Sequence, residues 1–129
     1  MISLSAKRSL LSGSLFLFLA VLIGAFGAHG LKKLVTPELL ATFETGVRYH
    51  FYHAMGLLFL GLLELRLPEI NLSKAASAFV VGILLFSFNC YFYVLTGTKI
   101  FAMIVPVGGT LFALGWFMLF WNLRKVKVV

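Results

Sequence analysis

Uncharged apolar runs long enough to cross a membrane are the feature that most constrains this chain. Residues 75–98 and 100–123 each form an uncharged run of 24 residues, separated by Lys99 alone, and residues 9–28 form another of 20. At 1.5 Å per residue, a helix of about 20 residues matches the roughly 30 Å hydrocarbon core of a bilayer. Membrane barrels would instead show alternating strands of about ten residues. The runs therefore predict an all-α integral membrane protein.

A fourth span is expected between the first run and the last two. Its uncharged part, residues 49–63, has only 15 residues, which is too short to span alone. The helix is expected to begin near Thr36-Pro37-Glu38, because threonine caps helices and proline suits the first turn. Glu44 and Arg48 stand four residues apart and are expected to pair at headgroup level. The chain is thus predicted to be one domain, residues 1–129, an up-down-up-down four-helix bundle spanning near 9–29, 45–66, 75–97 and 100–123.

The first run also resembles a secretory signal peptide. Lys7 and Arg8 precede it, and Ala25-Phe26-Gly27 near its end has the small residues of a cleavage site. Against cleavage, Ala20, Gly24 and Ala28 form a stripe of small residues at spacing four, which a packed membrane helix needs. We expect a signal anchor that stays in the protein.

Composition indicates lipid as the partner. The chain is 61% hydrophobic and 12% charged, far from soluble averages. Its net charge of +7 does not predict nucleic-acid binding, because the basic residues sit in pairs beside apolar runs instead of forming a polar patch. The single cysteine, Cys90, lies inside an apolar run, so a disulfide framework or a CxxCH haem attachment within one chain is excluded. Expected partners are membrane lipids, with a homo-oligomer or a larger membrane complex as further alternatives.

The distribution of Lys and Arg predicts the orientation. With four spans, one face carries seven basic residues and the other four, and the richer face is expected to be cytoplasmic. The seven are Lys7, Arg8, Arg66, Lys74, Arg124, Lys125 and Lys127, and the four are Lys32, Lys33, Arg48 and Lys99. Both termini are therefore expected in the cytoplasm.

Unusual polar residues are expected to meet in the non-cytoplasmic half of the bundle. The late parts of the first and third helices and the early parts of the second and fourth lie at that face. The candidate polar cluster consists of His29, Glu44, Arg48, His50, His53, Asn89 and Tyr93. At the same depth, Pro106 removes a helical hydrogen bond and Gly108-Gly109 tolerates a bend, which predicts a helix kink.

The histidines admit several interpretations. His50 and His53 are three residues apart, so both rings are expected on one side of their helix, with His29 nearby. They can hydrogen-bond carbonyls, lipid phosphates or other helices, relay protons or bind a small ligand, or hold a metal or haem. No carboxylate stands beside them, so no metal site and no cofactor are predicted. For Asn89, a hydrogen bond between helices is favoured over a ligand contact.

Four segments in order resemble a known family. They are Gly24-Ala-Phe-Gly-Ala-His-Gly-Leu-Lys32, Phe43-Glu-Thr-Gly-Val-Arg-Tyr-His-Phe-Tyr-His-Ala54, Gly82-Ile-Leu-Leu-Phe-Ser87 and Pro106-Val-Gly-Gly109. Together they resemble the YgdD-like small inner-membrane proteins, which implies four spans in the bacterial cytoplasmic membrane and no known activity. In that family, glutamine is common at the position of His50 and Gly-Ser at Phe88-Asn89. The resemblance thus implies that a family-wide site would involve His29, Glu44, Arg48 and His53.

No enzyme is predicted, because GxSxG, phosphate-loop and HExxH motifs and paired intramembrane carboxylates are missing. The favoured function is a non-enzymatic membrane module, either an accessory subunit or a lipid-interacting protein. The alternatives are a proton-coupled transporter working as an oligomer, and a redox subunit binding quinone or haem through His29 and His53. His29, Glu44, Arg48 and His53 are expected to cluster at one membrane face, with Arg48 holding Glu44.

Overall fold

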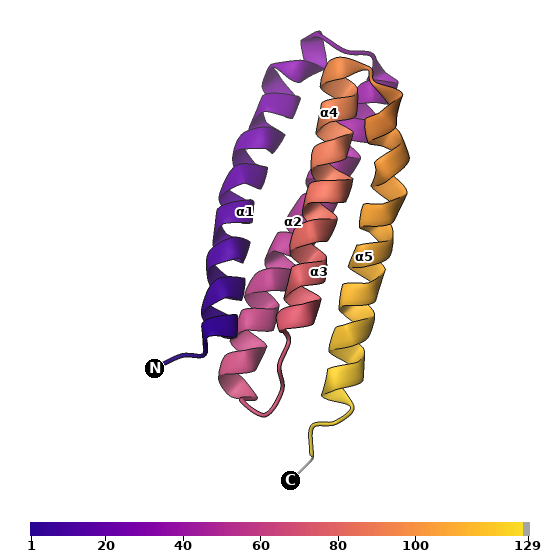
Figure 1. The fold of residues 1–129 in the computed structure, drawn as a ribbon. Helices are drawn as coiled ribbons and strands as arrows, with labels where there is room; N and C mark the ends of the chain where they lie inside the picture. The colour runs from indigo at the N-terminus through magenta and orange to yellow at the C-terminus, as the bar shows by residue number, and fades with distance from the viewer. Residues whose placement is uncertain (128–129) are drawn as a thin grey trace.

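The computed structural model describes residues 1–127, and every regular element in that range is helical (Figure 1). The α3, η2 and α4 segments follow one another without a break and form one long rod, of which η2 is a π-helical turn. The elements in chain order are α1 (Leu4–His29), the 3₁₀ turn η1 (Leu31–Lys33), α2 (Pro37–Arg66), α3 (Ser73–Ile83), η2 (Leu84–Phe88), α4 (Asn89–Thr96) and α5 (Lys99–Leu123).

Local sequence signals explain where the helices begin and end. The hydroxyl of Ser3 accepts the N–H of Ala6 at 3.0 Å, so α1 starts one turn before the apolar run that predicted it. Thr36 caps α2 and Pro37 occupies its first turn, where the sequence pattern places them. Gly97 has a φ of 69°, and this left-handed residue ends α4 two residues before α5 begins.

The four long rods form two helical pairs. In the first pair α1 packs along α2, and in the second the α3–η2–α4 rod packs along α5. α2 also lies against the α3–η2–α4 rod, whereas α1 makes few contacts with α3. Consecutive rods run in opposite directions, so that the N-terminus, the α2–α3 loop and the chain end near residue 127 lie at one end of the molecule (Figure 1). The α1–α2 and α4–α5 connections lie at the other end.

Close helix contacts depend on glycine at the crossing of η2 and α5. A Cβ atom on Gly108 would meet the backbone nitrogen of Phe86 and would lie 2.8 Å from the carbonyl carbon of Leu85. α5 remains one continuous helix through Pro106 and this crossing. Gly108 therefore lets two backbones touch, and the kink expected at Pro106, Gly108 and Gly109 stays a prediction.

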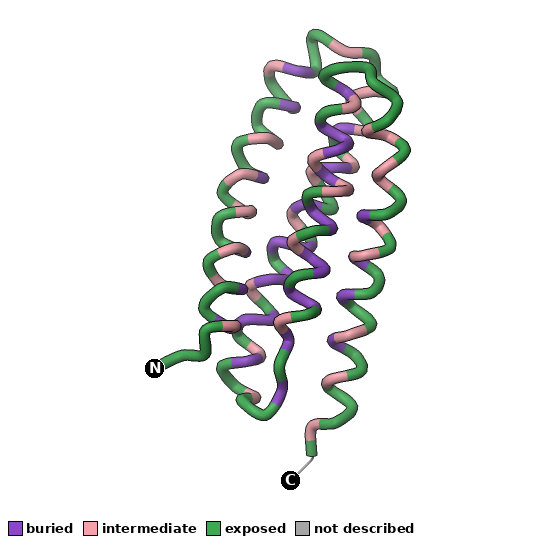
Figure 2. The backbone as a smooth tube through the Cα atoms, viewed as in Figure 1, coloured by how far each residue is buried: buried purple, intermediate pink, exposed green. Residues whose placement is uncertain are grey.

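Exposed residues follow the outer sides of the helices (Figure 2), and many of them are large and apolar, as expected for a protein whose solvent is lipid. The main core joins α2, α3 and α5 around Leu57, Leu60, Phe79 and Phe112. The outward faces remain apolar, with exposed residues that include Leu11, Leu15, Phe18, Phe59, Leu62, Met103, Phe117 and Phe120.

Three helical segments are long and apolar enough to cross a membrane: Leu4–Lys33, Ser73–Thr96 and Lys99–Leu123. α2 is as long as the first of them, with 30 residues, but charged residues near both of its ends, with histidines and tyrosines between them, dilute its apolar content. The structure supports a helical membrane protein with three such segments, and a fourth span through α2 remains a prediction.

Candidate functional site

His53 lies buried between α2, α3 and α5, with both ring nitrogens occupied. Its Nδ1 lies 2.7 Å from the carbonyl oxygen of Tyr49, and its Nε2 lies 3.1 Å from the indole nitrogen of Trp116. Because a carbonyl only accepts and an indole N–H only donates, the two bonds fix a neutral imidazole protonated on Nδ1. The ring also stacks on Phe112 with centroids 3.5 Å apart and planes 7° from parallel. His53 therefore serves to pack the interior, and neither of its ring nitrogens is free to bind a ligand.

His50 occupies a different environment although it is only three residues away. It is completely buried, and its Nδ1 lies 3.0 Å from the hydroxyl of Tyr91 on α4. Phe16 of α1 and Phe88 of η2 pack edge-on against its ring. Both rings contact the α3–η2–α4 rod, but His50 also contacts α1 whereas His53 contacts α5. Side chains three residues apart on a helix differ in direction by about 60°. On α2 this difference is enough for the ring of His50 to lie in the interface with α1 and the ring of His53 in the interface with α5.

His29, Glu44 and Arg48 lie at the end of the molecule that carries η1, and all three are exposed. Glu44 and Arg48 line a hollow of about 300 Å³ beside Gly24, Gly27 and Ala28, which His29 does not line. The expected Glu44–Arg48 ion pair is not formed within residues 1–127. The Arg48 guanidinium donates instead to the hydroxyl of Thr45 at 3.0 Å. In solvent an exposed pair gains little over its hydrated charges, so nothing holds the two side chains together.

His53 therefore does not share a site with His29 and Arg48. Its hydrogen bonds and ring contacts lead to Tyr49, Phe79, Phe112 and Trp116, whereas His29 is exposed at the last turn of α1. The cluster expected from the sequence is divided into an exposed group and two buried histidines.

Asn89 serves the π-helical turn. Its amide nitrogen donates to the carbonyls of Leu84 and Leu85, each at 3.1 Å, and these groups belong to the irregular segment η2. A wide turn changes the regular pairing of backbone carbonyls, and a side-chain donor restores it. Tyr93, on α4, is half-buried and packs against the apolar cluster around Leu31 and Phe43. Both residues have structural roles in this arrangement.

Glu64 is a buried polar residue that the sequence reasoning missed. Only 6% of it is exposed, and its Oε1 accepts the N–H of Leu72 and, at 3.0 Å, the hydroxyl of Ser5. It thereby ties α1 and the α2–α3 loop to α2. Its second oxygen is buried without a hydrogen-bond partner within the described chain. The sequence signal for Glu64 was a carboxylate directly after an apolar run. It was missed because the uncharged run ends at the first charged residue.

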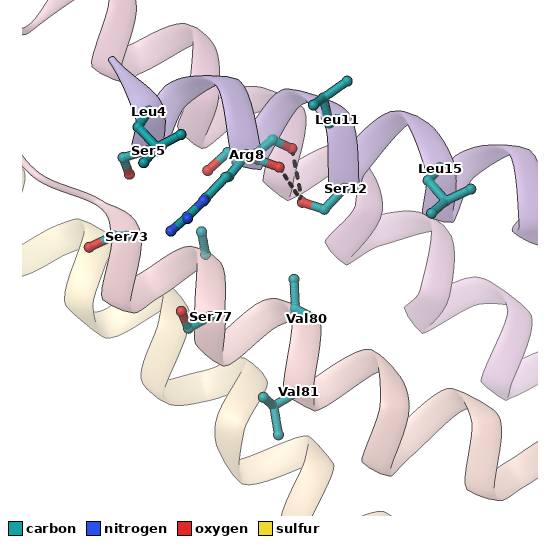
Figure 3. Close-up of a pocket in the computed structure, with 12 residues that line it drawn as sticks. Leu4, Ser5, Arg8, Leu11, Ser12, Leu15, Ser73, Ser77, Val80 and Val81 are labelled. Carbon is teal, nitrogen blue, oxygen red and sulfur yellow. Dashed lines mark hydrogen bonds between the residues drawn. The ribbon is translucent and has the colours of Figure 1, made fainter.

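A groove of about 690 Å³ lies between α1 and α3 (Figure 3). It lies at the end that carries the N-terminus, and Arg8 reaches from α1 toward α3 across its mouth. Serines line it from both helices: Ser5, Ser9 and Ser12 on α1, and Ser73 and Ser77 on α3. Their spacing of three or four residues is visible in the sequence and could have predicted a polar stripe on each helix.

Metal binding finds no ready site in residues 1–127, where no three His, Cys, Asp or Glu side chains gather closely enough to hold an ion. Cys90 is buried and free.

Comparison with known proteins places the chain in a family. Residues 23–109 match the family model described as "Protein of unknown function (DUF423)". The chain belongs to this family. Its relatives are named UPF0382 membrane proteins: one from Staphylococcus aureus is 38% identical over 113 residues, covering 88% of this chain and 92% of the relative. YwdK from Bacillus subtilis is 38% identical over 114 residues, covering 88% and 93%. A relative from Haemophilus influenzae is 34% identical over 110 residues, covering 85% and 88%.

No solved structure is similar to the chain. Membership in the UPF0382 family agrees with the predicted bacterial membrane protein of unknown activity, while the finer resemblance to YgdD-like proteins stays a prediction. The matched segment contains His29, Glu44, Arg48, His50 and His53, but it begins after Arg8 and ends before Trp116. The α1 side of the groove mouth, with Arg8, and the hydrogen-bond donor to His53 lie outside it, whereas Ser73 and Ser77 on the α3 side lie inside it.

Proposed function

We propose that the protein is a non-enzymatic, lipid-interacting module of the bacterial inner membrane. The observation that carries this proposal is the satisfied environment of His53, whose two ring nitrogens are bound to Tyr49 and Trp116 and whose face is covered by Phe112. A catalytic or ligating histidine needs a free nitrogen facing a space that a substrate can enter. His53 is instead used to pack the interior, and His50, whose Nε2 has no hydrogen-bond partner within the described chain, is completely buried and so faces no space that a substrate can enter.

The proposed membrane arrangement has four spans, with α2 as the second, in an up-down-up-down bundle like that implied by the YgdD-like resemblance. Seven Lys and Arg residues belong to the end with the termini and the α2–α3 loop, and four belong to the opposite end. The positive-inside rule then places both termini in the cytoplasm. The charges of α2 support this depth, because Glu38, Glu44 and Arg48 fall near one end of the helix and Arg66 at the other.

The other functions considered from the sequence receive less support from this geometry. A haem held between His29 and His53 would require an exposed ring and a fully bonded buried ring to reach one iron atom. A transporter would require an oligomer, since the interior of one chain is filled by aromatic side chains around His53 and Phe112. Assembly into a homo-oligomer or a larger complex is compatible with the proposed module.

Gentle purification followed by native mass spectrometry and absorbance spectroscopy tests the proposal. We expect the full chain to retain phospholipid and to show no Soret band or quinone absorbance. A stoichiometric cofactor would contradict the proposed function, whereas a stoichiometric partner protein would identify the module as an accessory subunit.

A further inference from the structure

The α1–α3 groove has a polar mouth and an apolar interior, which is the division a phospholipid requires. At the mouth, Arg8 projects across the gap toward Ser73 and Ser77 on α3 (Figure 3). Farther along the two helices, Leu11 and Leu15 on α1 face the same groove as Val80 and Val81 on α3. Because α1 packs mainly on α2 and makes few contacts with α3, the groove is open along its side. A lipid can therefore enter it from the bilayer without passing through water.

The mouth offers donors for an anion. Arg8 forms no ion pair in the described part of the chain, so its guanidinium is available, and it binds phosphate oxygens in a fixed two-pronged geometry. At the start of α3 the N–H of Leu72 donates to Glu64 and that of Ser73 to the amide oxygen of Asn71, so Arg8 is the principal donor at the mouth.

Ser9 supplies an independent indication that the groove wall is built for a polar contact. It lines the groove and is only 2% exposed, and its hydroxyl has no hydrogen-bond partner within residues 1–127. A buried hydroxyl without a partner costs about 1–3 kcal/mol. The oxygen is itself buried, so the Ser9 side chain would have to rotate toward the groove for a phosphate or glycerol oxygen beside Arg8 to supply the missing partner.

We propose that this groove binds one anionic phospholipid of the cytoplasmic leaflet. Its phosphate lies against Arg8 and the hydroxyl of Ser77, because the hydroxyls of Ser5, Ser12 and Ser73 already donate to acceptors within the chain. One acyl chain runs between Leu11 and Leu15 on one wall and Val80 and Val81 on the other. The net charge of +7, and the seven basic residues at this end, favour an anionic headgroup over a zwitterionic one. This inference deepens the proposed function and rests on it for lipid as the ligand and for the orientation of the chain.

The experiment is native mass spectrometry of the full chain in detergent, titrated with phosphatidylglycerol or with phosphatidylcholine of the same acyl chains. We expect phosphatidylglycerol to bind about tenfold more tightly, and Arg8→Ala to lower its affinity by about tenfold, the worth of one charge-assisted contact. Lys7→Ala is the matched control, because Lys7 is exposed on the same turn but does not line the groove. It is expected to change the affinity less than about twofold.

Equal losses from Arg8→Ala and Lys7→Ala would overturn the proposal, since they would indicate attraction by net charge alone. Displacement of the lipid by millimolar inorganic phosphate would also overturn it, because the ligand would then be the free anion. Equal affinity for the two headgroups would have the same consequence.

A second pair of variants tests the groove without changing any charge. Ser77→Leu places bulk in the groove and is expected to lower phosphatidylglycerol binding by about fivefold or more. Ser14→Leu is the control, because Ser14 is exposed on α1 outside the groove. Unchanged binding by Ser77→Leu overturns the proposed location. A chain that retains lipid without headgroup selection would refute this inference alone, whereas a chain that retains a redox cofactor would refute the proposed function itself.

Discussion

Trp116 on α5 donates its indole N–H to Nε2 of His53 on α2 across 3.1 Å, and within the described residues this is the one side-chain hydrogen bond that joins these two helices. The two helices make little direct backbone contact, and bulky rings fill the space between them. The orientation of His53, and with it the packing of Phe112, therefore depends on a donor supplied by the last helix.

Trp116→Phe removes that donor while keeping an aromatic ring. We expect it to lower the free energy of unfolding by about 1–3 kcal/mol, because Nε2 of His53 would be buried without a partner. Thermal unfolding in detergent, followed by near-ultraviolet circular dichroism, measures the change. Trp121→Phe is the control, since Trp121 is exposed and contacts Arg124. A loss as large for Trp121→Phe would show that the indole hydrogen bond contributes nothing specific.

Gly108→Ala tests the close approach of α5 to η2. The added methyl group would meet the backbone nitrogen of Phe86, which cannot move without disturbing the π-helical turn. We expect a loss of more than about 2 kcal/mol or failure to accumulate in the membrane. At Gly109 the same methyl group would lie 3.6 Å from the ring of Phe86, an ordinary contact. Gly109→Ala should stay within about 1 kcal/mol of the wild type, and equal behaviour of the two variants would refute the contact.

Glu64→Ala should loosen the α2–α3 loop. It leaves the N–H of Leu72 and the hydroxyl of Ser5 without their shared acceptor, at a cost of about 1–3 kcal/mol for each buried group. Limited proteolysis of residues 67–72, with thermal unfolding, measures the effect. Glu64→Gln keeps an acceptor oxygen and should recover part of the loss, and Glu69→Ala, at an exposed position, should match the wild type. Increased cleavage in Glu69→Ala but not in Glu64→Ala would contradict this role.

The proposed topology makes a separate prediction. A periplasmic phosphatase fused after Val129 should be inactive, because the C-terminus is placed in the cytoplasm. The same enzyme inserted after Lys33 or after Thr98 should be active, because both connections belong to the opposite end. Activity at the C-terminal fusion would reverse the orientation, and activity at only one of the two connections would indicate that α2 does not span.

The sequence allowed the helices to be located but not the directions of their polar side chains. Runs of 20 and 24 uncharged residues place α1, the α3–η2–α4 rod and α5 to within a few residues, because helix length must match a fixed thickness. Thr36 and Pro37 mark the start of α2 through backbone geometry alone. These signals are local and so can be read without knowing the packing.

The different surroundings of His50 and His53 depend on helix packing, and no local signal in the sequence predicts them. Whether His50 and His53 share an interface is decided by which helices flank α2, and a change of about 60° around its axis suffices to separate them. Trp116, 63 residues from His53, carries no mark in the sequence that distinguishes it from Trp121, and both side chains are partly exposed at the surface. In the sequence, Glu64 and Arg8 appear only as charges at the boundaries of apolar runs. In the structure Glu64 is buried and Arg8 extends across the α1–α3 groove.

The pairing of α1 with α2 has a consequence for how the chain is made. The contacts of α1 are almost all with α2, so the first 66 residues contain nearly everything that the first helix needs in order to dock. The side of α2 that carries His53 has no such early partner. Its indole donor, Trp116, lies 63 residues later in the chain. During translation this face of α2 is therefore exposed to lipid or to the insertion machinery until α5 has been synthesised.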